Sequence, residues 1–267
     1  MTADRVTTTD AVLETALRDL RTPAPPALAD RTLVELGLAD QFATLDAPIG
    51  PIQVAWNGRG VSLVGRADEG GFESRFATEI GRPLREAEAV PEPLASAIRR
   101  RLAGDRRVRI PLDLRGATEF QVAVWLKALD IPRGEVRPYG WVAAEIGRPK
   151  AVRAVGSALG RNPVPLVVPC HRVVRGDGSI GQYSMGGPEV KRLVLSTEGV
   201  DVDGLVSLAG RGIRFVGSDT TGIVCHPTCQ NARRVQARHL VQFRSLPQAV
   251  AAGYRPCRVC RPVASAA

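Results

Sequence analysis

The chain has 267 residues, of which 44% are hydrophobic, and a formal net charge of +9. This length and composition suffice for two or three small domains with buried cores. No apolar segment is long enough to span a membrane, and the polar first 30 residues lack the apolar core of a signal peptide, so we expect a cytoplasmic protein without a membrane function. The odd number of cysteines, five, also argues against a secreted disulfide scaffold.

Residues 1–40 predict a helical extension. A short helical pattern covers residues 11–20, prolines interrupt it, and a second apolar helix is expected to end near Leu38. We assign this extension no function.

The following residues, as far as 112, predict a small α/β domain. Apolar side chains alternate at Ile52, Val54 and Trp56, and the turn Asn57-Gly58-Arg59-Gly60 precedes a second apolar run, which predicts a β-hairpin. Helices are expected over 72–80 and 93–102, and a linker near 111–116.

Three further helices are predicted over residues 120–129, 141–146 and 149–159. The last two have the shape of a helix-turn-helix, with Gly147 ending the first of them and Pro149 at the first position of the second. Small residues in the third helix permit a close backbone approach, which on DNA favours a shallow minor-groove fit with Arg153 as the long side chain. A plain buried helix is the alternative interpretation.

The cysteines divide into two groups. Cys225 and Cys229 form a C-x3-C pair, Cys257 and Cys260 form a C-x2-C pair, and this spacing can place four thiolates around one tetrahedral zinc ion. The remaining cysteine, Cys170, stands beside His171 directly after an apolar run.

Positive charge is concentrated in two regions. Residues 211–267 contain nine arginines and one acidic residue, Asp219, and so carry +8 of the total charge. Residues 133–175 contain eight Arg or Lys against two glutamates. Both regions suit a polyanion such as a phosphate backbone. The alternative is that these arginines only solvate the surface.

A set of short motifs runs from about residue 118 to residue 200, in the order and spacing of the O6-alkylguanine-DNA alkyltransferases, which this region resembles. They are Phe120-Gln121-Val122, Ile131-Pro132-Arg133-Gly134-Glu135, Tyr139-Gly140, Arg153-Ala154-Val155-Gly156, Asn162-Pro163, Pro169-Cys170-His171-Arg172-Val173-Val174, Gly186-Gly187, Lys191 and Glu198-Gly199. The resemblance implies an α/β plus α fold: a ribonuclease-H-like amino-terminal domain, then a helix-turn-helix, winged-helix-like catalytic domain.

The resemblance also implies catalytic roles. Cys170 attacks the alkyl group on guanine O6 as a thiolate whose pKa is lowered. His171, held by Glu198, reaches the thiol through a water molecule, with the logic of a catalytic triad. Tyr139 donates a proton to the leaving guanine, and Asn162 is the hinge residue. Without the surrounding motifs, Tyr139 would be interpreted as a packing residue. Asn162 would be interpreted as part of a turn with its neighbouring proline.

The same resemblance implies the DNA contacts. Arg153 takes the place of a nucleotide flipped out of the duplex. The other predicted DNA-binding residues are Ala151, Ala154, Gly156, Arg161 and Arg172, and the predicted substrate loop contains Tyr183, Ser184 and Gly186. Pro138 stands where the family has serine, and the substrate loop is one residue longer, so the preferred size of the alkyl group stays open.

Residues 213–262 resemble the zinc-binding methyl-phosphotriester domain of the Ada protein. The resemblance rests on Thr220-Thr221-Gly222-Ile223, Cys225-His226-Pro227-Thr228-Cys229 and Ala251-Ala252-Gly253-Tyr254-Arg255-Pro256-Cys257-Arg258-Val259-Cys260. It implies one zinc ion on the four cysteines and a methyl-accepting role for Cys225; a purely structural zinc module is the alternative. Because four cysteines complete the site, His226 and His239 are predicted to be surface or phosphate-facing residues.

We therefore predict a monomeric DNA repair protein that transfers alkyl groups from O6-alkylguanine, and from O4-alkylthymine, in double-stranded DNA irreversibly to Cys170, once per molecule. It needs zinc and no organic cofactor. The predicted domains are a helical extension (1–40), an α/β domain (41–112), the alkyltransferase domain (113–200), a linker (201–212) and the zinc domain (213–267).

Three alternatives were weighed against this prediction. An Ada-type sensor or transcriptional regulator would need a separate regulatory DNA-binding domain, and we see none in the sequence. A Cys-His hydrolase is disfavoured because neighbours on an extended segment point to opposite sides. The presence of Cys170 itself argues against a non-reactive alkyltransferase-like binder.

Overall fold

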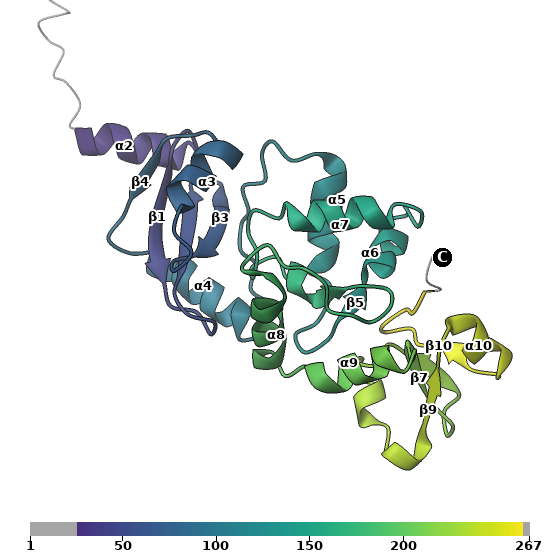
Figure 1. Cartoon of the computed structure of the whole chain (residues 1–267). Helices are drawn as coiled ribbons and strands as arrows, with labels where there is room; N and C mark the ends of the chain where they lie inside the picture. Colours follow the sequence, from purple (N-terminus) through teal and green to yellow (C-terminus); the bar gives the residue numbers. More distant parts are fainter. Residues whose placement is uncertain (1–25, 264–267) are drawn as a thin grey trace, which may run out of the picture.

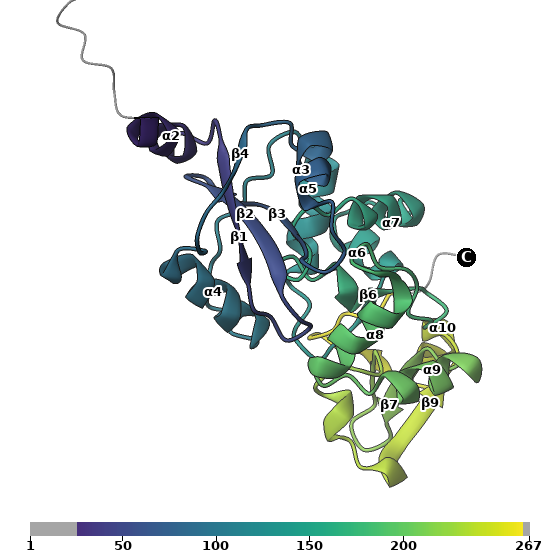
Figure 2. The same cartoon turned by 60° about the vertical axis from the view of Figure 1, so that its left-hand side comes forward.

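The computed structural model describes residues 26–263, so the helical pattern predicted over 11–20 lies outside the described residues. Figure 1 shows three units in chain order: an amino-terminal α/β unit, a central helical unit and a carboxy-terminal zinc module. The central unit lies between the other two in both views (Figure 2). It therefore contacts both of its neighbours.

The amino-terminal unit is a four-stranded sheet with the order β3-β2-β1-β4. Its strands are β1 (Asp40–Leu45), β2 (Ile52–Asn57), β3 (Gly60–Arg66) and β4 (Leu84–Glu86), and its helices are α2 (Pro26–Glu35), α3 (Phe72–Glu79) and α4 (Glu92–Leu102). The predicted hairpin is confirmed as β2 and β3, and α3 and α4 were also predicted. The strands β1 and β4 were missed, and α2 ends before the expected Leu38.

Alternation along the strands explains why the sheet is covered on both faces. Phe42, Ala55 and Leu63 pack with Phe72 and Phe76 of α3. Neighbouring positions on the other face, such as Val54, pack with Ile98 of α4 and with the central unit. Figure 2 shows α3 and α4 on opposite sides of the sheet. Because side chains alternate between the two faces of the sheet, one face packs against α3 and the other against α4 and the central unit.

Segment 111–116, predicted as a linker, is instead part of the first unit. The amide of Asp113 donates to Val61 O over 2.8 Å, and Leu112 forms a bridge with Val61 at the edge of β3. The Asp113 carboxylate accepts a hydrogen bond from Asn57 (2.8 Å) and forms an ion pair with Arg82 (3.0 Å). A buried carboxylate needs such partners, and they anchor the segment.

The central unit is built around α5 (Glu119–Ala128), α6 (Tyr139–Glu145) and α7 (Val152–Gly160). Thr118 and Gln121 form a capping box that starts α5, and Trp125 of α5 donates its indole N–H to Ala158 O of α7 over 2.8 Å. Gly147 ends α6 at φ 71°, as predicted. Helix α7 begins after Ala151, not at Pro149, because Pro149 lies in the preceding turn.

Two short strands of the central unit pair beside Cys170. Strand β5 (Arg137–Pro138) runs parallel to β6 (Val173–Val174), which directly follows a 3-10 turn over Cys170–Arg172. The expectation of an extended segment at Cys170 was wrong, because the chain tightens into this turn immediately after Pro169. Helix α8 (Gly187–Thr197) then packs against the turn.

The predicted linker 201–212 is mostly helix. Asp201 caps α9 (Val202–Gly210) through a 2.9 Å bond from the Gly204 amide. Val202 and Leu205 pack on Val136 and Leu195 of the central unit. A helix with an apolar face in a core is a structural element, which is why the segment does not act as a spacer.

The zinc module contains a second four-stranded sheet with the order β10-β8-β7-β9. Its strands are β7 (Phe215–Ser218), β8 (Ile223–Cys225), β9 (Leu240–Phe243) and β10 (Arg255–Pro256), with one helix, α10 (Leu246–Ala251). Phe215, Val224, Phe243 and Ala249 form a small core on one side, and the four cysteines cluster on the other.

Candidate active site and metal centre

The Cys170 thiol is almost enclosed, with 6% exposure, and Asn162 holds it. The Asn162 amide nitrogen donates to Cys170 Sγ over 3.2 Å and to Val168 O over 3.0 Å, while its oxygen accepts from the Val164 amide over 3.1 Å. Asn162 thus spans the chain between the end of α7 and the cysteine. Its role as a hinge stays a prediction.

His171, Glu198 and Arg172 form a buried relay behind the cysteine. His171 Nε2 lies 3.1 Å from Glu198 Oε1, and Arg172 makes two bonds of 2.7 and 2.8 Å to the same carboxylate. Arg172 also donates to Ile131 O over 2.7 Å. The prediction that Arg172 binds DNA was wrong: its guanidinium is buried and paired, so it holds Glu198 in place.

The protonation states of this relay follow from burial. Burial acts to raise the pKa of Glu198, but hydrogen bonds from His171 and Arg172 outweigh it and lower that pKa to about 2. Burial lowers the pKa of His171 and raises that of Cys170, although the Asn162 hydrogen bond and the Lys191 charge act the other way on the thiol. The lowered pKa expected for Cys170 was therefore wrong, and the resting pair is a neutral imidazole and a thiol.

Lys191 is the site residue whose role the sequence did not reveal. Its amine is buried on α8 and donates to Val173 O over 2.6 Å. Burial lowers the pKa of Lys191 to about 8, and ionisation of Cys170 acts to raise it. A lysine among apolar positions of an amphipathic helix was the available signal, because a buried lysine needs a specific partner.

Tyr139 and Tyr183 approach the cysteine from different elements. Tyr139 is the first residue of α6, and burial followed by the nearby Cys170 raises its pKa. Tyr183 is buried, its ring and that of His171 form a T-shaped pair with centroids 6.0 Å apart, and its hydroxyl lies 3.5 Å from Met185 Sδ. In the predicted substrate loop, Ser184 is exposed and Gly186 starts α8 at φ 97°.

The predicted DNA-contacting residues of α7 lie on its outer face. Arg153 and Ala154 are exposed, Ala151 and Gly156 are half-buried, and Arg161 is exposed just after the helix. A side chain at Gly156 would meet the Tyr139 ring at 4.0 Å. The small residues therefore expose the helix backbone close to the tyrosine.

The four remaining cysteines form a metal centre. Their sulfur atoms all lie within 4.8 Å of one another, and all four side chains are buried. Tetrahedral zinc with Zn–S bonds of about 2.3 Å separates its sulfurs by about 3.8 Å, so the cluster fits this ion. The Asn231 amide and the His226 backbone amide donate to two of the sulfurs.

The two histidines of the module differ in environment. His239 is partly exposed and pairs with Asp219 over 2.9 Å. The surface prediction for His226 was wrong: it is 4% exposed and lies with Val136 and Pro138 in the crevice between the module and the central unit. Neither histidine completes the metal site.

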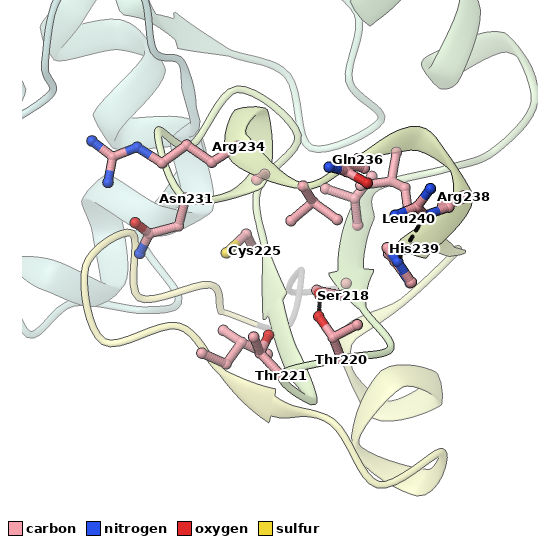
Figure 3. Close-up of a pocket in the computed structure, with 15 residues that line it drawn as sticks. Ser218, Thr220, Thr221, Cys225, Asn231, Arg234, Gln236, Arg238, His239 and Leu240 are labelled. Carbon is pink, nitrogen blue, oxygen red and sulfur yellow. Dashed lines mark hydrogen bonds between the residues drawn. The ribbon is translucent and has the colours of Figure 1, made fainter.

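A cavity of about 630 Å³ opens beside the cysteine cluster. Among the four cysteines, Cys225 alone lines it, together with Asn231, Arg234, Arg238 and other polar residues. Figure 3 shows the Cys225 sulfur on the cavity wall, with Thr221 and Asn231 around it. One ligand sulfur is thus distinguished from the other three by its access to a cationic cavity.

Comparison with known proteins agrees with this division of the chain. Residues 119–200 match the model of the 6-O-methylguanine DNA methyltransferase DNA-binding domain, and residues 209–263 match the metal-binding domain of Ada. The methylated-DNA–protein-cysteine methyltransferase of Mycobacterium bovis is 37% identical over 59% of this chain and 91% of its own length. The bifunctional transcriptional activator/DNA repair enzyme Ada of Escherichia coli is 37% identical over 56% of this chain and 43% of its own length.

Solved structures give the same result for the fold. The crystal structure of Mycobacterium tuberculosis OGT in complex with DNA superposes with a TM-score of 0.51 and 33% identity, over 62% of this chain and 98% of that one. The site and the fold thus define a cysteine-dependent alkyltransferase with an appended zinc centre. The chain belongs to the methylated-DNA–protein-cysteine methyltransferase family. Within residues 26–263, no helix has the length and apolar character needed to cross a membrane.

Proposed function

We propose that this protein repairs DNA by moving an alkyl group from guanine O6 to its own Cys170. The observation that carries the proposal is the enclosed thiol held by Asn162 in front of the His171–Glu198–Arg172 relay. A soft sulfur nucleophile suits an in-line attack on an alkyl carbon. A neutral thiol beside a neutral imidazole is stable until the substrate arrives.

The reaction forms one bond and breaks one. Cys170 gives its proton to His171, Sγ bonds to the alkyl carbon, and the carbon–O6 bond breaks with its electron pair passing to guanine. Tyr139 supplies the proton that neutralises the guanine, and the proton on His171 restores the phenol. His171 Nδ1 is buried without a protein partner among the described residues, which supports a bridging water molecule toward the thiol.

The thioether product explains the single turnover. A carbon–sulfur bond to cysteine has no leaving group that this site can activate, so each molecule reacts once. Alkylated guanine is the main substrate, and O4-alkylthymine offers the same carbon–oxygen bond to attack.

Access to guanine O6 requires base flipping, which we assign to α6 and α7 acting as a helix-turn-helix. The exposed Arg153 would fill the space left in the duplex, while the half-buried Gly156 lets the backbone approach. We also infer that the four-stranded sheet with α3 and α4 corresponds to the ribonuclease-H-like domain of the family, and that the central unit corresponds to its winged-helix-like domain. A monomer suffices for all of these roles.

The direct test is repair of a duplex that contains one O6-methylguanine. The wild type should remove the methyl group, and Cys170→Ala should still bind the duplex but leave the lesion intact. Cys170→Ala that still repairs the lesion would show that another residue is the nucleophile.

A second candidate function is methyl transfer from a phosphotriester to Cys225. The cavity favours it, because Cys225 is the one cysteine of the four that lines this cavity. The zinc-bound thiolate would attack the methyl carbon and release a phosphodiester. The four-thiolate site would change from −2 toward −1, which reduces its repulsion of DNA phosphates.

DNA with methyl phosphotriesters and no damaged bases tests this second function. Cys170→Ala should gain one methyl group on Cys225 and then bind DNA more tightly at low salt. Zinc-loaded protein that never acquires this methyl group has a purely structural module, and an Ada-type regulatory role would then have no switch.

A further inference from the structure

The zinc module is fixed to the segment that carries Tyr139. Thr228 is buried in the loop between two zinc ligands, and its hydroxyl accepts a 2.9 Å bond from the Val136 amide and lies 3.3 Å from Val136 O. The Gln230 amide donates to the Glu135 carboxylate over 3.0 Å. Side-chain hydrogen bonds therefore join the loop to the chain immediately before β5.

A second anchor lies at the other end of the same segment. Arg261 pairs with Glu145 at the end of α6 over 2.6 Å, and its guanidinium lies 5.9 Å from the centre of the Trp141 ring. The two anchors thus bracket residues 136–145, and Tyr139 lies between them.

Each anchor adjoins a different pair of zinc ligands. Thr228 directly precedes Cys229, and Arg261 directly follows Cys260. These two halves of the module are 27 residues apart in sequence, and a shared metal ion makes them one body. The distance between the anchors is therefore fixed by the zinc site.

The bracketed segment also reaches the nucleophile. Arg137 and Pro138 of β5 pair with Val173 and Val174 of β6, directly after the Cys170–Arg172 turn. Strand β5 thus links Tyr139, which directly follows it, to the turn that bears the cysteine.

We propose that the zinc module is a clamp that positions Tyr139 for alkyl transfer at Cys170, with Thr228 as the positioning residue. This inference rests on the proposed alkyltransferase function. It assigns the module a role at the base-repair site that is separate from methyl transfer to Cys225.

Thr228→Val tests the clamp, because it keeps the shape of the side chain and removes the hydroxyl. Leaving the buried Val136 amide without its acceptor should shift the equilibrium for local opening of this segment by roughly tenfold. We expect Thr228→Val to retain one zinc ion, to exchange the amide hydrogens of residues 134–140 about tenfold faster than the wild type, and to alkylate Cys170 several-fold more slowly. Thr228→Ser, which keeps the hydroxyl, should restore both properties.

The choice of substrate separates positioning from DNA binding. Thr228→Val should slow reaction with free O6-methylguanine as much as with duplex DNA, because Tyr139 acts on both. In a Tyr139→Phe background it should add little, since the two changes affect one interaction. If Thr228→Val loses zinc, Arg261→Gln provides the same comparison. Arg261→Lys is then the conservative control.

The clamp would be overturned by wild-type exchange across 134–140 in Thr228→Val, or by an equal slowing of the reaction in the wild-type and Tyr139→Phe backgrounds. A wild type that transfers no alkyl group would overturn the proposed function and the clamp together. A reactive wild type with an equally reactive Thr228→Val would overturn the clamp alone.

Discussion

At the scale of single residues, the buried carboxylate of Glu198 couples the active site to pH. Its pKa is about 2, below the ordinary 4.5, so it contributes stability above about pH 4.5 that is lost as the pH falls toward 2. That difference corresponds to about 3 kcal/mol. We expect the wild type to lose more unfolding free energy than Glu198→Gln between pH 6 and pH 3 in urea titrations. Equal losses in the two proteins would contradict the assigned pKa.

Arg153 and Tyr139 are expected to affect different substrates. Flipping a base out of a duplex costs a few kcal/mol, whereas a free base costs nothing to extrude. Arg153→Ala should therefore react much more slowly with duplex DNA and nearly normally with free O6-methylguanine, while Tyr139→Phe should slow both. Equal losses on the two substrates for Arg153→Ala would assign that residue to chemistry or folding.

Motifs predicted which residues gather around Cys170, but not their environment. Asn162, His171 and Glu198 were all placed at the site from the sequence. The raised pKa of Cys170 and the buried ion pair of Arg172 could not be predicted, because both depend on side-chain burial, which no local pattern encodes. His226 was misplaced for the same reason, since Phe215 of its own module and Val136 and Pro138 of the central unit together cover it.

At the scale of elements, periodicity predicted most helices and the β2–β3 hairpin of the amino-terminal unit, and it failed where long-range pairing decides the structure. Strand β4 has three residues, and its one strand partner is β1. Segment 111–116 has a composition typical of a linker, yet Asp113 ties it to β2 and β3. Partners distant in sequence supply these interactions, so neither feature has a local signal.

Asp113 should therefore be important for the stability of the first unit. Burial opposes its ionisation, but hydrogen bonds from Arg115 and Asn57 and the charge of Arg82 lower its pKa to about 2. Asp113→Asn removes the charge that these arginines face and should cost about 3 kcal/mol of unfolding free energy. Glu92→Gln breaks the exposed pair with Arg99 and should cost less than 1 kcal/mol. Similar midpoints for the two variants in urea would contradict the buried network.

At the scale of the whole molecule, the metal holds the third unit together. The module has only a small apolar core, so folding of residues 213–263 should depend on the ion. We expect one zinc ion per chain, and a Cys257→Ser variant should lose the metal and the protection of the module against proteolysis. A metal-free module that resists protease as the wild type does would exclude a structural role for zinc.

In the proposed function, the repair of alkylated bases belongs to the central unit. Alkyl transfer to Cys170 is the central claim, and peptide mass spectrometry after incubation with excess O6-methylguanine duplex tests it most directly. We predict one added methyl group per chain, located on the peptide that contains Cys170, with no further addition there as the duplex is increased. Repair of the lesion while this peptide stays unmodified would contradict the account.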